Sequence, residues 1–238
     1  MSHFHGGGAL QDPWQKRPAD VALGDDEVHL CLANVELMES QPDVLWRVLS
    51  EGERARADGF HFERDRQRYV ARRALLRQLA GEYLQMAPDK IGFTENPFGK
   101  PELVSEVGVA LQFNLSTSGE WVLYGFNRRR KIGVDIEKIR SDFNWSEIAA
   151  RYFHPHEGSD IGELPESERV GAFFTYWTLK EAFLKAHGVG LQRPLVEFDF
   201  ATVVREGKKQ FTDTDGSKWL CTSLKPGAGL VAGLVIEA

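Results

Sequence analysis

The sequence has 238 residues and a mass of 26.8 kDa; 42% of the residues are apolar and 27% are charged, which suits one large or two small folded domains and excludes a disordered chain. Lysine and arginine total 29 against 35 aspartates and glutamates, and the net charge of -6 argues against a general nucleic-acid-binding protein. Cys31 and Cys221 are too few for a disulfide framework, so we expect a reducing compartment and two small core residues.

The chain shows no segment typical of membrane insertion or secretion. Its longest weakly polar stretch, Gly227 to Ala238, is shorter than the ~20 residues that a membrane span requires. The opening MSHFHGGG lacks the charged and apolar regions of a secretory signal. We therefore expect a cytoplasmic protein whose residues 1–27 form a flexible tail.

The first half is predicted to combine a long helix with short strands. Residues 28–35 form a first strand, and short helical segments follow between residues 41 and 60. From Glu63 to about Met86 apolar residues recur at helical spacing, with arginines on the other face, and Pro88 ends this helix. A turn-rich segment, two strands and a basic turn come next: NPFGKPEL (96–103), FNLSTS (113–118), WVLYGF (121–126) and RRRK (128–131).

The second half is predicted to repeat a long helix followed by three strands. A short strand, IGVDIE (132–137), and small helices between 145 and 157 precede a helix from about Pro165 to His187, which Gly188 and Gly190 end. Three strands are expected after it, with DTDG (213–216) turning between the first two: Val196 to Val204, Lys218 to Leu224, and Leu230 to Ile236.

The two long helices are similar in sequence. YVARRALLR (69–77) aligns with WTLKEAFLK (177–185), 108 residues later, with two identical and four conservative positions. The same offset aligns the strand 121–126 with 229–234. We interpret this as two similar halves with a cleft between them, although helical periodicity alone also generates such similarities.

One aligned position differs in charge between the halves. The first half carries the cation Arg73 where the second carries the carboxylate Glu181. A two-fold cleft built this way would hold an anion on one side and a metal on the other. The pairing with Arg73 also favours an inward direction for Glu181 and for Lys185, which otherwise form an ordinary i,i+4 surface pair.

Asp135 and Glu137 lie two residues apart on a predicted strand. Their side chains therefore leave the same face, while Val134 and Ile136 point into the core. Carboxylates at this spacing suit Mg²⁺, which binds a few carboxylates, waters and substrate phosphates. The same pattern is also common as ordinary surface charge on half-exposed strands.

Other polar residues are compatible with phosphate or metal binding but are individually unspecific. Lys100 lies between Gly99 and Pro101 in a rigid loop, and FNLSTS offers hydroxyls at a strand end; plain turn chemistry explains both equally well. His154 and His156 flank Pro155 and are expected to be loop residues, because the sequence shows no further ligands for a zinc site there.

Together, FNLSTS, GVDIEKIR (133–140) and WTLKEAFLKAHGVGL (177–191), with NPFGKPEL upstream, resemble the 4'-phosphopantetheinyl transferase superfamily. The order, spacing and length are similar to the long two-lobed type named for the surfactin-synthetase activator, and unlike the short trimeric holo-acyl-carrier-protein synthases. The resemblance covers residues 54–191. It implies an α+β pseudodimer of two similar halves, 28–131 and 132–238, each a long helix on a small antiparallel sheet, with coenzyme A and the active site at the seam.

The resemblance also implies residue roles. Asp135, Glu137 and Glu181 would coordinate Mg²⁺, with Mn²⁺ as an alternative, and Lys185 would add charge beside the coenzyme A pyrophosphate. The remaining contacts to the coenzyme A phosphates and adenosine fall on Arg56 (with Arg54 as a rival), Arg73, Lys100, Ser116 and Thr117. Thr117 stands where the family usually has a histidine, so the charge of an imidazolium is lost at that position.

The implied reaction transfers the phosphopantetheine arm of coenzyme A to a serine of an acyl or peptidyl carrier protein. Asp135, Glu181 and Lys185 are the expected catalytic residues, with Glu181 as the base, directly or through a metal-bound water. The partner would be a small acidic helical carrier domain that meets the basic turn 128–131 or the arginine-rich helix from Arg64, and the enzyme would be a monomer. Two alternatives stay open: a non-catalytic relative that binds coenzyme A or a carrier protein, and a Mg²⁺-dependent phosphate-ester hydrolase.

Overall fold

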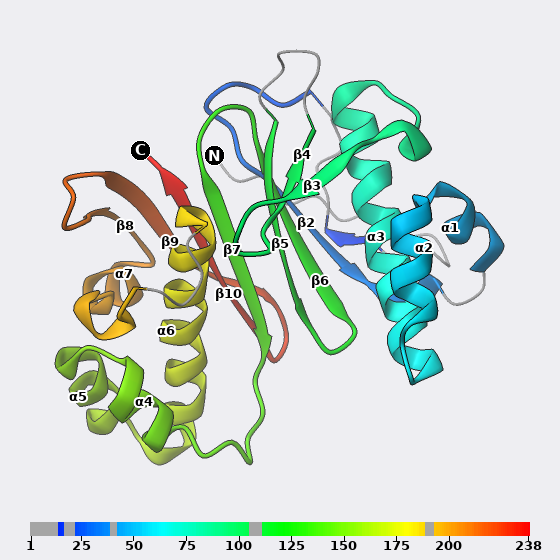
Figure 1. Cartoon of the computed structure of the whole chain (residues 1–238). Helices are drawn as coiled ribbons and strands as arrows, with labels where there is room; N and C mark the ends of the chain where they lie inside the picture. Colours follow the sequence, from blue (N-terminus) through cyan, green and yellow to red (C-terminus); the bar gives the residue numbers. More distant parts are fainter. Residues whose placement is uncertain (1–13, 17–21, 39–41, 105–110, 189–192) are drawn as a thin grey trace. The chain divides into compact units, whose positions relative to one another are not determined.

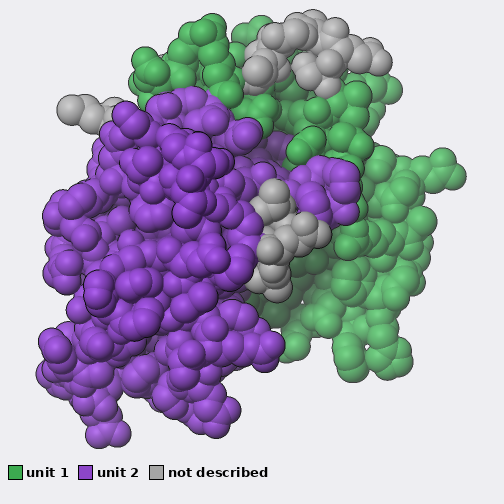
Figure 2. Space-filling view, turned by 60° about the vertical axis from the view of Figure 1, so that its left-hand side comes forward, with its two compact units in different colours: residues 1–95, 101–112, 119–129 green, residues 96–100, 113–118, 130–238 purple. Residues whose placement is uncertain are grey.

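The computed structural model describes residues 14–16, 22–38, 42–104, 111–188 and 193–238 (Figure 1). These residues divide into two compact units, which Figure 2 colours separately. Unit 1 comprises 1–95, 101–112 and 119–129, and unit 2 comprises 96–100, 113–118 and 130–238. Each unit contains antiparallel strands and one helix of 22 residues, so the predicted α+β, two-lobed class is confirmed.

Unit 1 is built around helix α3 (Glu63–Leu84) and three antiparallel strands. The helix ends at Gln85, which adopts a left-handed conformation with φ 53°, three residues before Pro88. The other elements of unit 1 are β1 (Trp14–Lys16), β2 (His29–Asn34), η1 (Val35–Met38), α1 (Pro42–Val48), α2 (Glu51–Asp58), η2 (Pro88–Lys90), β3 (Phe93–Glu95), β4 (Pro101–Leu103) and β6 (Trp121–Asn127). Strand β1 lies within the expected flexible tail and pairs with β2; residues 1–13 and 17–21 of that tail lie outside the described residues.

Unit 2 contains a four-stranded antiparallel sheet in the order β7-β10-β9-β8. Its strands are β7 (Ile132–Lys138), β8 (Lys208–Thr212), β9 (Lys218–Gly227) and β10 (Leu230–Glu237), and β5 (Gln112–Ser118) joins the unit from residue 113 onward. Helix α6 (Glu166–His187) packs along β7 and β10, and Gly188 ends it with φ 73° (Figure 1). The shorter helices are α4 (Ser146–Tyr152), α5 (Pro155–Glu163), η4 (Leu195–Glu197) and α7 (Ala201–Glu206).

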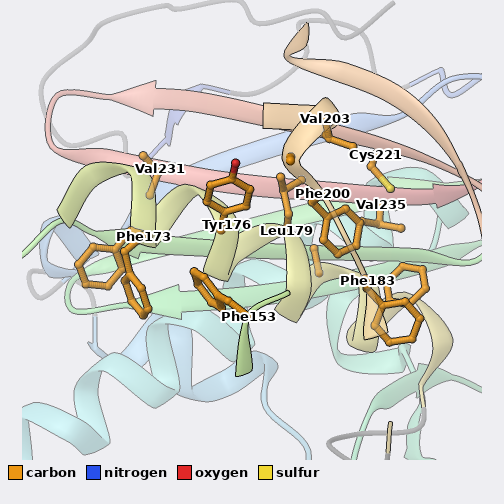
Figure 3. Close-up of a cluster of buried hydrophobic side chains, with 14 of the residues drawn as sticks. Phe153, Phe173, Tyr176, Leu179, Phe183, Phe200, Val203, Cys221, Val231 and Val235 are labelled. Atoms are coloured by element: carbon orange, nitrogen blue, oxygen red, sulfur yellow. The ribbon is translucent and has the colours of Figure 1, made fainter. Parts of the chain in front are cut away.

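Aromatic side chains of α6 fill the core of unit 2 around the helix (Figure 3). Phe173 stacks on Phe153 with ring centroids 5.1 Å apart, the hydroxyl of Tyr176 donates to Asp160 of α5 at 2.9 Å, and Phe183 packs against Trp219 of β9. Removing such large apolar side chains from water is the main stabilising contribution to this unit. Cys221 belongs to the same cluster, and Cys31 is buried in unit 1, so both cysteines are the small core residues that the sequence predicts.

Two glycines bring the backbone of α6 directly onto the strands. A Cβ atom on Gly133 of β7 would lie 2.0 Å from the carbonyl oxygen of Ala182, and one on Gly233 of β10 would lie 2.4 Å from that of Thr178. Glycine inside a strand is typical of such close backbone approach. Because Gly233 lies opposite Asp135 in the strand register, this contact fixes where α6 crosses the carboxylate strand.

Gly133→Ala is expected to lower the free energy of unfolding by about 3 kcal/mol, since the helix backbone must move away from β7. The measurement is urea denaturation. Gly158→Ala is the matched control: it lies in α5 with open space around its Cβ position, so we expect a gain of about 1 kcal/mol from helix propensity. Equal stability of the Gly133→Ala variant and the wild type would contradict the close packing.

The strand predicted at 196–204 is wrong. Residues 195–197 form η4, and α7 begins at Ala201, whose backbone amide donates to Asp199 Oδ1 at 2.9 Å. Phe198 and Phe200 alternate as in a strand. However, Lys180 Nζ donates to the carbonyl oxygens of Leu195 and Phe198, at 2.9 and 2.7 Å, so these oxygens are not available for pairing with a neighbouring strand. The third strand is β8, which the sequence analysis missed because its residues are polar and largely exposed.

The turn between β8 and β9 anchors the end of α6. Asp213 accepts hydrogen bonds from His187 Nε2 at 2.9 Å and from Arg193 Nη1 and Nη2 at 2.5 and 2.8 Å. Burial raises the pKa of Asp213, but a larger combined effect lowers it from 3.8 to about 2. The lowering comes from the hydrogen bonds and charge of Arg193 and from the hydrogen bonds donated by the Thr214 amide and by His187.

Acid is therefore expected to destabilise the protein through Asp213. The stabilisation from its ionised form is complete above pH 4 and is lost as the pH falls from 3.8 through 2, which amounts to about 2 kcal/mol. Urea denaturation as a function of pH measures it, and in Asp213→Asn this part of the pH dependence should disappear. An unchanged pH profile in that variant would contradict the assignment.

Candidate active site

Strand β7 presents two carboxylates toward α6. Asp135 and Glu137 share the face of Gly133, which contacts the helix backbone, while Val134 and Ile136 on the other face are fully buried. Asp135 is only 5% exposed, so it is a buried carboxylate rather than ordinary surface charge.

Strand β5 supplies a hydroxyl to each of these carboxylates. Ser116 Oγ donates to Asp135 Oδ1 at 2.7 Å, and Ser118 Oγ donates to Glu137 Oε2 at 2.6 Å. Asn114 Oδ1, two residues earlier, accepts from the backbone amide of Val134 at 2.8 Å. The sequence analysis missed this pairing. A signal was present: two hydroxyls two residues apart on one extended segment can meet two carboxylates two residues apart on another, because both pairs leave one face of their segment.

Helix α6 adds a cation and a third carboxylate. Lys185 Nζ donates to Asp135 Oδ1 at 2.7 Å and to Ser116 Oγ at 2.9 Å. Glu181 lies one turn earlier; burial and the charge of Asp135 raise its pKa, Lys185 lowers it and Glu137 raises it again. Burial also raises the pKa of Glu137, as does Asp135, while Ser118 lowers it. The three carboxylates thus outnumber the one ammonium group in this cluster.

The cluster fits a divalent metal ion. Asp135 Oδ2 is buried and, within the described part of the chain, has no hydrogen-bond partner. A buried carboxylate oxygen without a partner is costly unless a cation approaches it. Ser116 and Lys185 hold Oδ1, so Oδ2 is fixed in orientation, and the carboxylates of Glu137 and Glu181 are the hard oxygen ligands that Mg²⁺ prefers.

Lys100 anchors the NPFGK turn to unit 2. Its Nζ donates to the carbonyl oxygen of Lys185 at 2.7 Å and to that of Ile132 at 3.2 Å. Asn96 Nδ2 donates to the carbonyl oxygen of Gly188 at 3.0 Å, and its Oδ1 accepts from the backbone amide of Lys100. An ammonium group at the end of α6 also interacts favourably with the helix dipole, so Lys100 supports the helix that carries Lys185.

The remaining predicted phosphate contacts lie elsewhere. Thr117 is exposed and, by strand alternation, leaves β5 on the face opposite Ser116 and Ser118. Arg73, in unit 1, donates through Nε to Glu53 Oε1 at 2.7 Å, and Arg77 Nε donates to Glu53 Oε2 at 2.6 Å.

The two rival arginines of unit 1 differ in their contacts. Arg56 has a side chain that is 65% exposed and lies 3.3 Å from Glu95, whereas Arg54 donates to the carbonyl oxygens of Trp46 and Arg47 at 3.2 and 3.0 Å. The structure therefore leaves Arg56 the more accessible of the two.

The predicted carrier-binding arginines form ion pairs and hydrogen bonds within unit 1. In the basic turn, Arg128 Nε donates to the carbonyl oxygen of Leu23 at 2.6 Å, and Arg129 lies 2.9 Å from Asp25. In α3, Arg66 lies 3.4 Å from Asp58 and covers the ring of Trp46, while Arg64 is largely exposed. Arg64 and Arg129, whose side chains are each 71% exposed, are thus equally accessible to a partner.

A cavity of about 320 Å³ in unit 1 is separate from these carboxylates. Its lining comes from η1, α1 and the first half of α3, and includes Met38, Trp46 and Ala71. None of the predicted site residues is among its lining residues.

Comparisons with known proteins match both parts of the chain. Residues 131–235 match the family model described as the 4'-phosphopantetheinyl transferase superfamily, and residues 38–126 match that of the 4'-phosphopantetheinyl transferase N-terminal domain. The 4'-phosphopantetheinyl transferase HetI of Nostoc sp. is 36% identical over 228 residues, which cover 95% of this chain and 94% of HetI. The chain belongs to the 4'-phosphopantetheinyl transferase superfamily.

Other transferases in bacteria and animals are also similar. The 4'-phosphopantetheinyl transferase Sfp of Bacillus subtilis is 31% identical over 162 residues, covering 68% of this chain and 70% of Sfp. The L-aminoadipate-semialdehyde dehydrogenase-phosphopantetheinyl transferase of Xenopus laevis is 31% identical over 190 residues, covering 73% of this chain and 63% of the relative. The chain is thus a phosphopantetheinyl transferase, an enzyme that uses coenzyme A and acts on carrier proteins. Among the described residues of this transferase, no helix is long and apolar enough to cross a membrane.

Proposed function

We propose that the transferase moves the 4'-phosphopantetheine arm of coenzyme A to a serine of an acyl or peptidyl carrier protein, releases adenosine 3',5'-bisphosphate and depends on Mg²⁺. The observation that carries the proposal is the fixed, unpartnered Oδ2 atom of Asp135 beside Glu137 and Glu181. A buried, unpartnered carboxylate oxygen that interacts with two further carboxylates favours a cation, and a pyrophosphate substrate brings ligands for the same cation.

Asp135, Glu137 and Glu181 are the residues that would hold Mg²⁺. When bound, Mg²⁺ supplies charge neutralisation and alignment of the pyrophosphate oxygens, which is the main contribution to catalysis in phosphoryl transfer. Ser116 and Ser118 orient Asp135 and Glu137 through the hydrogen bonds of β5, so the carboxylates need little reorganisation when the ion arrives.

Lys185 and Glu181 have complementary roles in the proposed reaction. Lys185 holds Asp135 and places positive charge beside the pyrophosphate. The oxygen of the carrier serine attacks the β-phosphorus of coenzyme A, the bond from that phosphorus to the bridging oxygen breaks, and adenosine 3',5'-bisphosphate leaves. Glu181 is the proposed acceptor of the proton of the serine hydroxyl. Burial and the charge of Asp135 raise its pKa in the protein without a cation, and the charge of a bound Mg²⁺ would lower that pKa again.

The adenosine end of coenzyme A is assigned to Arg56, Arg73, Lys100 and Thr117, and a phosphate contact to Ser116, by the family pattern. The exposed guanidinium of Arg56 supports its part of this assignment. Arg73 and Lys100 would have to share their present partners with the substrate. Ser116 would donate to a phosphate only by releasing Asp135, whose Oδ1 atom Lys185 would then hold alone.

The remaining parts of the proposal concern the enzyme as a whole. We propose a cytoplasmic monomer in which residues 28–131 and 132–238 are the two halves of a pseudodimer. Mn²⁺ is the proposed substitute for Mg²⁺, and an acidic helical carrier domain is the proposed partner.

The test is transfer itself. The transferase is incubated with coenzyme A, Mg²⁺ and an apo carrier protein, and the carrier is weighed by intact mass spectrometry with and without EDTA. We expect the carrier to gain the mass of one phosphopantetheine arm, and EDTA to prevent it. Adenosine bisphosphate released without any carrier would instead indicate a hydrolase, and coenzyme A binding without transfer to several carriers would indicate a non-catalytic relative.

A further inference from the structure

A second cluster of potential metal ligands lies in unit 2 and shares no residue with the carboxylate site. It comprises His154 and His156, at the start of α5, and Asp199, just before α7. One ligand atom from each residue lies within 4.8 Å of the others. The sequence predicts the two histidines in a loop, which is wrong: His154 is the N-cap of α5 and His156 lies in its first turn. The third ligand, which the sequence analysis did not find, is Asp199, 43 residues after His156.

The backbone holds these three side chains in place. Pro155 begins α5, and the amide of His154 donates to Glu157 Oε2 at 2.8 Å. Asp199 Oδ1 accepts from the amide of Ala201, which leaves Oδ2 directed at the imidazoles. Glu157 Oε1 accepts from the amide of Phe200 at 2.9 Å, so one buried carboxylate ties the start of α5 to the segment that carries Asp199.

The distances match the requirements of a transition metal. Asp199 Oδ2 lies 2.9 Å from His156 Nδ1 and 3.7 Å from His154 Nδ1. Tetrahedral zinc with bonds of about 2.1 Å separates its ligand atoms by about 3.4 Å, which is close to these distances. His154 Nδ1 accepts a hydrogen bond from the amide of His156 at 3.3 Å, which it would exchange for the metal. Two imidazoles with one carboxylate favour zinc over magnesium, and the 74% exposed side chain of His156 leaves room for water as a further ligand.

We propose that His154, His156 and Asp199 form a surface site for a divalent transition-metal ion, with Zn²⁺ as the physiological ion. The site is independent of the transfer reaction. A bound ion would link the beginnings of α5 and α7. Because the ion binds the folded state and not the unfolded state, it would raise the melting temperature.

The test uses Zn²⁺ itself, titrated by isothermal calorimetry in excess Mg²⁺ so that the carboxylate site is occupied. The starting protein carries His3→Ala and His5→Ala, since these two imidazoles lie outside the described residues and offer competing ligands. We expect one Zn²⁺ per chain and a higher melting temperature. Co²⁺ is expected to give the visible absorption of a site with nitrogen ligands.

Two variants and a control decide the outcome. His156→Ala and Asp199→Asn are each expected to weaken Zn²⁺ binding at least tenfold. Both should fold, because His156 is exposed and the amide oxygen of asparagine can still accept from the backbone amide of Ala201. His61→Ala removes an exposed histidine of unit 1 and should leave binding unchanged. No binding in the starting protein, or unchanged affinity in His156→Ala, would overturn the proposal.

Discussion

Glu181→Gln is expected to lower the kcat/KM of transfer about 10³-fold. The amide can neither accept the proton of the carrier serine nor supply a negatively charged ligand, and a general base alone contributes about 10² to 10⁴. The measurement is the rate at which apo carrier gains the arm at saturating Mg²⁺. Glu168→Gln is the matched control, because this exposed glutamate on the same helix is remote in sequence from the carboxylate cluster and its replacement should leave the rate unchanged.

The same variant separates a catalytic role from a structural one. At neutral pH the ionised, partly buried Glu181 is destabilising, since burial and the charge of Asp135 raise its pKa. We therefore expect Glu181→Gln to melt at a higher temperature than the wild type in EDTA, while Mg²⁺ stabilises only the wild type. A variant that transfers within threefold of the wild type, or that gains as much stability from Mg²⁺, would contradict the role of Glu181.

Lys180→Met is expected to lower the free energy of unfolding by about 4 kcal/mol. Lys180 Nζ lies 2.8 Å from Glu157 Oε2, and both side chains are 0% exposed. Without the lysine, Glu157 becomes a buried charge with no counter-ion, and the carbonyl oxygens of Leu195 and Phe198 lose their donor. Urea denaturation measures the loss, and Lys225→Met, an exposed lysine of β9, is the control that should leave stability nearly unchanged.

A double variant tests whether the cost comes from the stranded charge. Adding Glu157→Gln to Lys180→Met removes the charge and keeps an acceptor oxygen for one of the two backbone amides, those of His154 and Phe200, so we expect the double variant to recover part of the stability that Lys180→Met loses. A double variant less stable than the single one would show that the ion pair is not the source of the effect.

Local sequence patterns predicted the long helices well, because both depend on apolar periodicity and a nearby stop. They failed at 196–204, where the alternation of Phe198 and Phe200 has the period of a strand. There Lys180, far away in sequence, takes the backbone carbonyl oxygens and so decides the conformation. No pattern within that segment carries this information.

The site shows the same division between local and long-range information. The spacing of Asp135 and Glu137 predicted their common face, because strand alternation is local. The hydrogen bonds from Ser116 and Ser118 depend on how β5 aligns with β7, and Asp199 meets the two histidines only after the chain folds. The sequence predicts Lys100 in a rigid loop, but its ammonium group donates to the carbonyl oxygens of Lys185 in α6 and Ile132 in β7, both distant in sequence.

The direct contact of α6 with Gly133 and Gly233 makes the carboxylate site independent of the size of its neighbours. Backbone meets backbone there, so no side chain sets the separation between helix and strand. Engineers can therefore vary the aromatic residues of unit 2, for example Phe173 or Phe153, to change heat resistance while the carboxylates on β7 and α6 keep their spacing. The same contact limits directed evolution, since any larger residue at Gly133 would displace Glu181 and Lys185 together.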